Sequence, residues 1–459
     1  GSEYTSNSVF GRVIYSYADR YLFQANVRHD GSSRFAKGYR WGTFPSFSAG
    51  WVASEEKFMK NLKWDWLSFL KLRGSWGMLG NERIGSNYFP YIALMSFGNS
   101  LFYMADGSVV SDKTARPAVL AVEDITWETT TSTDLGLDVN FLNNRLQFHF
   151  DYYWKETKDM LLNIEIPYFM GYNNPSTNAG KMSTHGYDIE VAWNDQIGDF
   201  KYGVNVNFSD FLSKIDYMND GEQISGGKIK RAGVLFNEFY GYVCEGIYQT
   251  QEEVNNSART STTVTVGDLK YRDISGPDGV PDGVISPEYD RVPLGNSLPR
   301  FQYGGSLNAS YKGIDFSLAF QGIGKQNSYL STSMVQPLRD NYGNVPAILE
   351  GKYWSPFNTT EENLAAKYPR LSNVSKSNNY ATSNFWMFNG SYFRLKNITL
   401  GYTLPKSWTQ KAGINRARFY VSGSDLFCLS NFPSGWDPEM GTSDYPITTS
   451  LVMGIQVNF

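Results

Sequence analysis

Apolar and polar residues alternate along much of the chain with a period of two. Within 135–141, every second residue is Leu, Val or Phe, and Gly, Asp and Asn lie between them. After the turn-like residues 142–145, the alternation resumes over 146–154. Because successive side chains of a β-strand point to opposite faces, the pattern predicts two amphipathic strands joined as a hairpin.

The same alternation recurs at 187–194, 200–208 and 314–321. One side of each predicted strand is aliphatic and strongly aromatic, whereas the other side carries mainly Asn, Gln, Asp and Gly. Strands of this kind suit a barrel that has lipid outside and a wet lumen inside. The sequence therefore predicts an all-β protein, a transmembrane antiparallel β-barrel.

Short and long connections alternate between the predicted strands, as in barrels with tight periplasmic turns and long outer loops. Short ones are expected at 18–20, 142–145, 195–199 and 312–313, and 54–66 and 405–414 should each contain a helical turn. Long outer loops are expected at about 81–128, 157–183, 216–298, 326–390 and 430–448.

The up-and-down order closes with about thirteen crossing strands if the last strand ends in the periplasm. This count requires that 236–248 is not a crossing strand but part of an excursion on the outer side. It also requires that the first strand runs inward from an N-terminus on the extracellular side. Since an odd strand number is incomplete for a bacterial barrel, we expect this chain to be the C-terminal part of a larger one.

Composition agrees with a membrane boundary. Aromatic residues make up 16% of the 459 residues, with 31 Tyr, and such rings suit water–lipid interfaces. No run reaches the ~18 apolar residues of a membrane helix. A net charge of −4 argues against nucleic acid. Cys244 and Cys428 lie far apart, which disfavours a disulfide framework or a zinc site and leaves their redox state open.

Catalytic motifs are absent from the sequence, so we expect no enzyme activity. There is no G-x-S-x-G or H-E-x-x-H run, and His29, His149 and His185 are scattered. By the strand pattern, His149 faces the lumen. A pair of glycosidase carboxylates stays open, because its two members can be distant in sequence.

Several stretches resemble SusC/RagA-type TonB-dependent outer-membrane transporters of Bacteroidetes. They follow the order of that family, at 28–51, 71–81, 390–405 and the WDPE run 436–439. The final strand 451–459 ends in Phe459, which resembles the signal read by the barrel-assembly machinery.

The resemblance implies an active importer in the bacterial outer membrane, energised through TonB, for oligosaccharides or oligopeptides. Full-length members resemble 22-stranded barrels with an N-terminal plug, which we expect to lie outside this chain, and a SusD-type surface lipoprotein serves as the lid. A surface-exposed adhesin or glycan-binding barrel, and a passive porin, remain as alternatives. The polar, mostly uncharged lumen residues favour a glycan over a charged peptide.

Aromatic clusters in the expected outer loops are candidates for contact with substrate or lid, because flat rings suit sugar faces, peptides and protein surfaces alike. The alternative is an aromatic girdle or packing within the loops themselves. The candidate residues are Tyr88, Phe89, Tyr91, Phe102, Tyr103, Phe385, Trp386, Phe388 and Trp436.

One Gly-rich run, 273–285, carries oxygen side chains that could converge on a structural Ca²⁺. It resembles an Asp/Gly-rich run common in the family. Pro277 and Pro281 interrupt the compact spacing, and a tight turn that uses Asp and Gly for their backbone conformations is the plainer interpretation. The candidate ligands are Asp273, Ser275, Asp278 and Asp282.

Overall fold

A computed structural model gives the arrangement of these elements. It describes residues 3–62, 64–84, 88–93, 95–117, 120–219, 221–330, 335–337, 345–441 and 445–459. Parts of the loops expected at 81–128, 216–298, 326–390 and 430–448 lie outside the described residues. All candidate site residues are described.

Thirteen strands of the described chain form one antiparallel sheet, which confirms the expected fold class and strand number. Its order is β1-β2-β3-β4-β7-β8-β9-β10-β17-β18-β21-β22-β23. The strands are β1 (Ser6–Tyr17), β2 (Tyr21–Ser32), β3 (Trp41–Val52), β4 (Leu67–Asn81), β7 (Glu128–Phe141), β8 (Leu146–Asn163), β9 (Ser176–Ile197), β10 (Phe200–Met218), β17 (Arg300–Tyr311), β18 (Ile314–Lys325), β21 (Tyr392–Thr403), β22 (Arg416–Ser430) and β23 (Ser450–Asn458).

The hairpin predicted from alternation is formed by β7 and β8. Leu135 pairs with Tyr152 and Asp138 with His149, so apolar partners share one face and polar partners the other. Leu142, Asn143 and Asn144 adopt positive φ in the turn, a conformation that Asn tolerates well. Both medium connections contain helical turns: η1 (Ala53–Glu55) and α1 (Lys57–Asn61), then α6 (Lys406–Thr409) and η5 (Gln410–Ala412).

The remaining described elements lie in the long connections. They are β5 (Met95–Tyr103), β6 (Val109–Pro117), η2 (Tyr168–Met170), β11 (Glu222–Ser225), β12 (Lys228–Arg231), β13 (Glu238–Tyr242), β14 (Cys244–Ile247), α2 (Gln251–Asn256), β15 (Leu269–Tyr271), β16 (Arg291–Asn296), β19 (Asn327–Tyr329), η3 (Ala347–Leu349), α4 (Thr360–Leu364), α5 (Lys376–Asn379), η4 (Asn384–Trp386) and β20 (Met387–Asn389). Strands β13 and β14 belong to small separate sheets. The segment 236–248 is therefore an excursion, as the strand count required.

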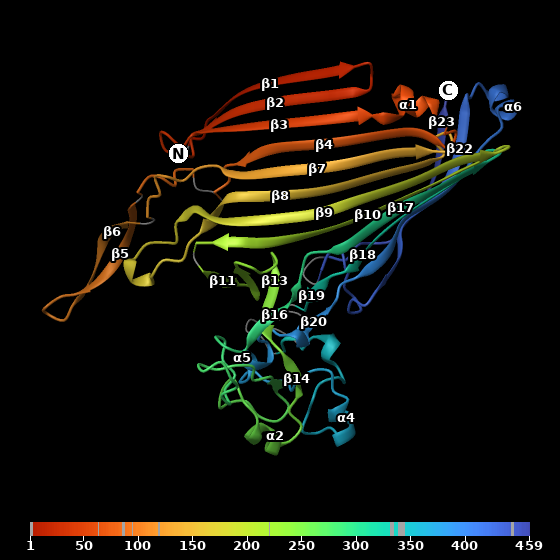
Figure 1. The fold of residues 1–459 in the computed structure, drawn as a ribbon. Helices are drawn as coiled ribbons and strands as arrows, with labels where there is room; N and C mark the ends of the chain where they lie inside the picture. Colours follow the sequence, from red (N-terminus) through yellow and green to blue (C-terminus); the bar gives the residue numbers. More distant parts are fainter. Residues whose placement is uncertain are drawn as a thin grey trace. The chain divides into compact units, whose positions relative to one another are not determined.

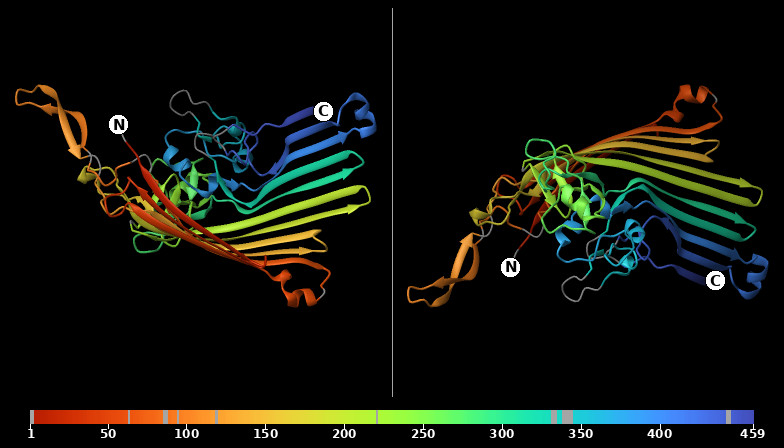
Figure 2. Two further views of the ribbon diagram at one scale, coloured as in Figure 1. Left: turned by 90° about the horizontal axis from the view of Figure 1, so that it is seen from above. Right: turned by 90° about the horizontal axis from the view of Figure 1, so that it is seen from below.

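The chain divides into two compact units. Unit 1 comprises Gly1–Trp193, Asp210–Gln223 and Arg231–Leu235, and unit 2 comprises Asn194–Ser209, Ile224–Lys230 and Phe236–Phe459. Within unit 1, β1–β4, β7 and β8 lie side by side (Figure 1). The β5–β6 hairpin projects away from them (Figure 2).

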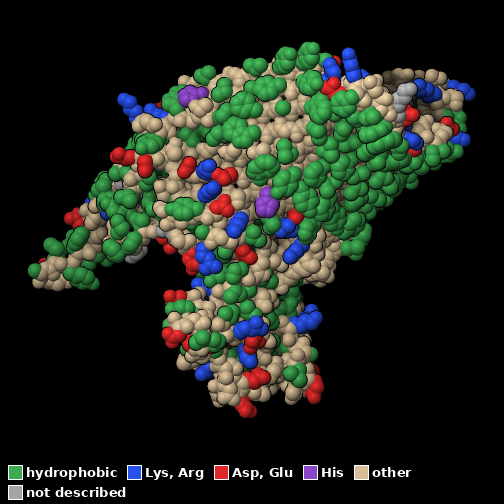
Figure 3. Space-filling model, viewed as in Figure 1, with side chains coloured by type: hydrophobic (Ala, Val, Ile, Leu, Met, Phe, Trp, Pro, Cys, Tyr) green, Lys and Arg blue, Asp and Glu red, His purple; other side chains and the backbone are tan. Residues whose placement is uncertain are grey.

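Each unit exposes large apolar side chains on one face of its strands. In unit 1, Leu135 and its partner Tyr152 are 54% and 41% exposed. In unit 2, Leu400, Val421 and Met453 are cross-strand neighbours on β21, β22 and β23, and all three are exposed. Hydrophobic side chains gather in a broad area on the surface (Figure 3). None of the helices in the described part of the chain is long and apolar enough to cross a membrane.

Candidate functional site: a loop module and the polar face of the sheet

The two longest connections of unit 2 fold together into what we call the loop module, which comprises 236–298, 326–330, 335–337 and 345–391 in the described part of the chain. Its core contains Trp386, which is 1% exposed, and further buried side chains from both connections. The other core members are Tyr242, Leu269, Tyr271, Ile285, Leu330 and Val335. Segments about a hundred residues apart thus share one apolar core.

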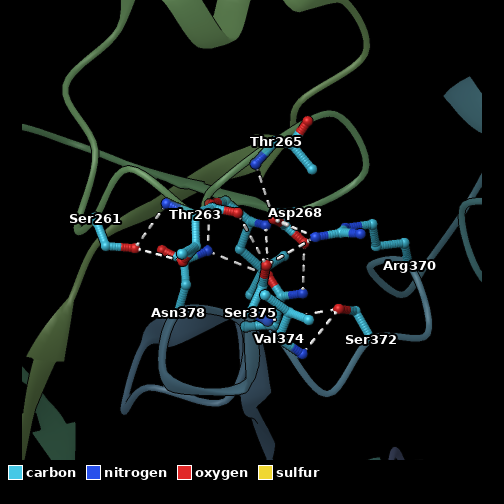
Figure 4. Close-up of polar contacts among 11 residues, drawn as sticks. Ser261, Thr263, Thr265, Asp268, Arg370, Ser372, Val374, Ser375 and Asn378 are labelled. Atoms are coloured by element: carbon cyan, nitrogen blue, oxygen red, sulfur yellow. Dashed lines mark hydrogen bonds and ion pairs between the residues drawn. The ribbon is translucent and has the colours of Figure 1, made fainter.

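A buried carboxylate joins the two halves of the loop module (Figure 4). Asp268 is fully buried, and its oxygens accept hydrogen bonds from Arg370 Nε at 2.7 Å, Asn379 Nδ2 at 2.9 Å and the Thr265 backbone N–H at 2.9 Å. Asn378 Nδ2 donates to the Leu269 carbonyl at 2.9 Å. Because a buried charge is tolerated only when it is paired and hydrogen-bonded, this network fixes how the two connections fit.

Burial also shifts titrations in the loop module. It raises the pKa of the Cys244 thiol to about 11, so this thiol stays protonated at neutral pH. Burial likewise raises the pKa of the Tyr329 hydroxyl to about 12. Cys244 and Cys428 are both free cysteines. These groups have the properties of packed side chains rather than of nucleophiles.

The structure brings the C-terminal aromatic candidates together. The Trp386 indole packs against Phe385, with ring centroids 4.8 Å apart, and donates from Nε1 to the Asn379 carbonyl at 2.8 Å. Phe388 and Trp436 pack against the same core. Since Trp386 is almost fully buried, its ring has no surface for a ligand, and the structure gives it a packing role. Phe385, Phe388 and Trp436 are partly exposed and remain candidates.

The WDPE run is tied to the sheet by an arginine that the sequence did not single out. Arg394 of β21 is 3% exposed and donates from Nη2 to Asp437 at 2.6 Å, while its Nε lies 2.6 Å from Glu439. Lys396 lies 2.7 Å from Asp425 of β22 and 3.5 Å from Glu439. We call these five residues the ionic latch. They hold the last long connection, which contains Trp436, against the sheet at β21 and β22.

Asp437 lies outside the sheet, and its titration reflects the ionic latch. Burial alone would raise the pKa of Asp437, but the Arg394 guanidinium and the backbone N–H of Glu439 together lower that pKa below its ordinary value. Asp437 is therefore a carboxylate at neutral pH and pairs with a fixed cation.

The Asp/Gly-rich run forms a turn held by its own hydrogen bonds. Asp273 accepts from the Gly283 N–H at 2.7 Å, and Asp282 accepts from the Val284 N–H at 2.9 Å. Asp290, which lies beyond the predicted ligands, accepts from Ile274 and Ser286 N–H groups at 2.7 Å. Among the described residues, no group of three or more His, Cys, Asp and Glu is placed to hold a metal ion. Calcium binding, which was also expected to involve Ser275 and Asp278, stays a prediction.

In unit 1, the aromatic candidates occupy two places. The Tyr88 ring lies 4.7 Å from the Arg34 guanidinium, which also contacts the Tyr4 ring, and Tyr91 donates to the Ser33 carbonyl. Phe89, the next residue after Tyr88, is half-buried. On the β5–β6 hairpin, adjacent strand residues Phe102 and Tyr103 point to opposite faces and are 46% and 84% exposed.

The polar face of the sheet differs between the units. In unit 1, Arg73 donates to Asp138 at 3.2 Å and to Asp151 at 2.6 Å, and His149 lies 3.0 Å from Asp138. The predicted position of His149 on the polar face is thus observed. In unit 2, the residues of β10, β17 and β18 on the polar face carry mainly amide or hydroxyl side chains, or are glycines. The alternation of polar residues could have indicated Arg73, but not its partners on other strands.

Comparisons with known proteins agree on one family. Residues 1–422 match the family described as TonB dependent receptor-like, beta-barrel. The chain is 31% identical to TonB-dependent receptor P3 of Formosa agariphila, over 98% of this chain and 45% of that protein. It is 30% identical to TonB-dependent receptor SusC of Bacteroides thetaiotaomicron, over 98% of this chain and 43% of that protein.

A solved structure, described as the RagAB peptide transporter, is similar with a TM-score of 0.79. The match covers 100% of this chain and 48% of that one at 24% sequence identity, which shows the fold alone. The chain spans less than half the length of the curated relatives it matches.

Proposed function

The chain belongs to the TonB-dependent receptor-like β-barrel family of outer-membrane proteins, and from this premise we propose that it forms the C-terminal wall and outer loops of an active nutrient importer. The cargo is an oligosaccharide or an oligopeptide. In this proposal, transport is energised through TonB by an N-terminal plug-bearing portion, and a SusD-type surface lipoprotein covers the outer mouth.

One observation carries the proposal: the sheet is apolar and exposed on one face and polar on the other. Leu400 and Val421, for example, are exposed on neighbouring strands, whereas Arg73 of unit 1 belongs to an ionic cluster. A barrel that has lipid against the apolar face and a water-filled lumen against the polar face accounts for both. The relatives are named as receptors, which favours transport over catalysis.

The long connections supply the surface for the lid and the cargo. The β5–β6 hairpin carries Phe97, Leu101 and Tyr103 on one face, exposed at 80%, 70% and 84%. Exposed aromatic and aliphatic side chains of this kind suit a protein partner. In unit 2, the ionic latch and the loop module give the partly exposed Phe385, Phe388 and Trp436 a rigid support.

The test is to extract the protein from its native outer membrane in mild detergent and to identify every co-purifying chain by mass spectrometry. We expect a plug-bearing portion and a surface lipoprotein, together with loss of oligosaccharide or oligopeptide uptake when the gene is deleted. Isolation of the barrel with only copies of itself, and unchanged uptake, would contradict an importer with a lid. An adhesin or a passive porin would then be favoured.

A further inference from the structure

A hollow of about 520 Å³ lies on the polar face of unit 2, where β10, β17, β18 and β21 meet. It exists because Gly304 occupies the position between Asn207 and Gln321 in the strand register. A Cβ on Gly304 would lie 3.2 Å from Asn207 Oδ1, so a larger side chain there would enter the space. The lining residues are Asn205, Asn207, Ser209, Gln302, Tyr303, Gly304, Gly305, Ser306, Phe320, Gln321, Gly322, Ile323 and Tyr392.

The described lining carries no charged side chain, and its polar groups are amides and hydroxyls. The amides of Asn207 and Gln302 have no protein hydrogen-bond partner among the described residues. An amide both donates and accepts hydrogen bonds, which matches the hydroxyl groups of a sugar, since each of these also does both.

One wall of the hollow is held in place by the ionic latch. Gln321 Nε2 donates to Glu439 at 2.9 Å and to the Tyr392 hydroxyl at 3.3 Å, while Glu439 is paired with Arg394. The orientation of the Gln321 amide is therefore set before any ligand arrives, which lowers the entropic cost of binding. The Tyr392 side chain is 7% exposed and is fixed in the same network.

The charge of the lining distinguishes two classes of polymer. A peptide of mixed sequence brings ammonium and carboxylate groups, which lose hydration in a hollow that offers no opposite charge. The strand backbones here are already paired in the sheet, so they cannot form a ladder with a peptide strand. A neutral sugar chain needs neither a charge partner nor a free strand edge.

We propose that this hollow is a subsite for a neutral oligosaccharide, held by the side chains of Asn207, Gln302 and Gln321 over the floor formed by Gly304. The proposal rests on the proposed import function and narrows its cargo. It assigns the binding contacts to the wall of the barrel in addition to the outer loops.

Isothermal titration of the full-length protein, with its co-purifying chains, tests the subsite. The probes are malto-, cello-, xylo- and manno-oligosaccharides, with acetylated and amidated neutral peptides as the competing class. For the sugar that binds, we expect Asn207→Ala with Gln302→Ala to weaken affinity about tenfold, since each lost hydrogen bond costs about 0.5–1.5 kcal/mol. Gly304→Leu, which fills the hollow and removes no amide, should weaken binding at least as much.

Asn308→Ala is the matched control, because Asn308 is exposed on the same face of β17 but does not line the hollow. It should leave affinity unchanged within about twofold. Retained heat-modifiable mobility on unboiled gels would establish that each variant barrel is folded.

Uptake by cells that carry the same variants separates the subsite from the import function. Wild-type uptake of a neutral oligosaccharide, with affinity unchanged in both the double variant and Gly304→Leu, would refute the subsite and leave import standing. Binding and uptake of the peptides alone would overturn the sugar assignment. Absence of any uptake by the wild type would overturn the import function and the subsite together.

Discussion

Among single residues, Arg394 has the most demanding environment. Its side chain is 3% exposed, and three carboxylates, Asp425, Asp437 and Glu439, lie within 3.7 Å of it. Removing such a cation from water is costly unless several charged partners compensate. The partners come from β22 and from the last long connection, so this charge pairing restricts how that connection can lie against the wall.

Replacing Asp437 by Asn should release this connection. The substitution removes one of the negative charges that compensate the buried guanidinium, and breaking a buried ion pair costs about 3 kcal/mol or more. We expect faster proteolytic cleavage within 431–441 and a lower midpoint of thermal unfolding for unit 2. Glu222→Gln is the control, because its pair with Arg231 is exposed at both ends and should contribute at most about 1 kcal/mol. Equal cleavage rates for Asp437→Asn and wild type would contradict the latch.

The same carboxylate predicts a pH dependence. The pKa of Asp437 is lowered in the folded protein, so its stabilising contribution is present above the unfolded-state value of about 3.9 and is lost as pH falls through the lower folded value. Cleavage within 431–441, by a protease active in acid, should therefore increase below about pH 4. Asp437→Asn should lack this step, and a step of equal size in that variant would assign it to another group.

Period-two alternation correctly placed His149 on the polar face, because the direction of a side chain in a strand depends only on its neighbours in sequence. The partners of Arg394 were not predictable in this way. Asp437 lies 43 residues away across a connection whose path depends on tertiary packing. The environment of Trp386 also depends on tertiary packing. Its place in an expected outer loop suggested a ligand surface, whereas its ring is enclosed by residues from both halves of the loop module.

Among the elements, the loop module is expected to behave as a cooperative folding unit. Its core and the Asp268–Arg370 pair both join segments about a hundred residues apart. Removing one central contact should loosen both connections together, while the strands of the sheet keep their own ladder of hydrogen bonds.

Trp386→Ala tests this unit. Truncating a buried Trp costs about 3–5 kcal/mol, so we expect faster hydrogen exchange over both 236–298 and 345–391. The sheet should persist, with unchanged heat-modifiable mobility and slow exchange in β17 and β18. Trp408→Ala, at a position 64% exposed in α6, is the control and should alter neither segment. Faster exchange confined to residues next to 386 would contradict a cooperative module.

The thirteen-strand sheet could be predicted from sequence because each amphipathic strand carries its own pattern and each short turn its own signal. Counting strands also placed 236–248 outside the sheet. The internal structure of the long connections could not be predicted. Their short strands, such as β13 and β19, have three to five residues and pair with distant partners, so local alternation carries little information about them.

For the whole molecule, the decisive property is that the two faces of the sheet meet different solvents. Leu307 and Asn308 are consecutive residues of β17 and lie on opposite faces. Both are exposed, Leu307 at 38%, so neither is required for packing within the chain. If the apolar face meets lipid and the polar face meets a wet lumen, a charge should be costly at the first position and tolerated at the second.

Leu307→Arg and Asn308→Arg therefore form a matched pair for refolding into phospholipid vesicles. A lipid-facing Arg costs about 2–4 kcal/mol near the bilayer midplane and less toward the interfaces, whereas an Arg in the lumen stays hydrated. We expect Leu307→Arg to lower the free energy of unfolding, measured by urea titration of tryptophan fluorescence, and Asn308→Arg to change it little. Because the two variants carry the same charge at adjacent positions of one strand, only the solvent at each face distinguishes them. Equal losses would mean that both faces meet the same medium, which would contradict the membrane barrel on which the import function depends.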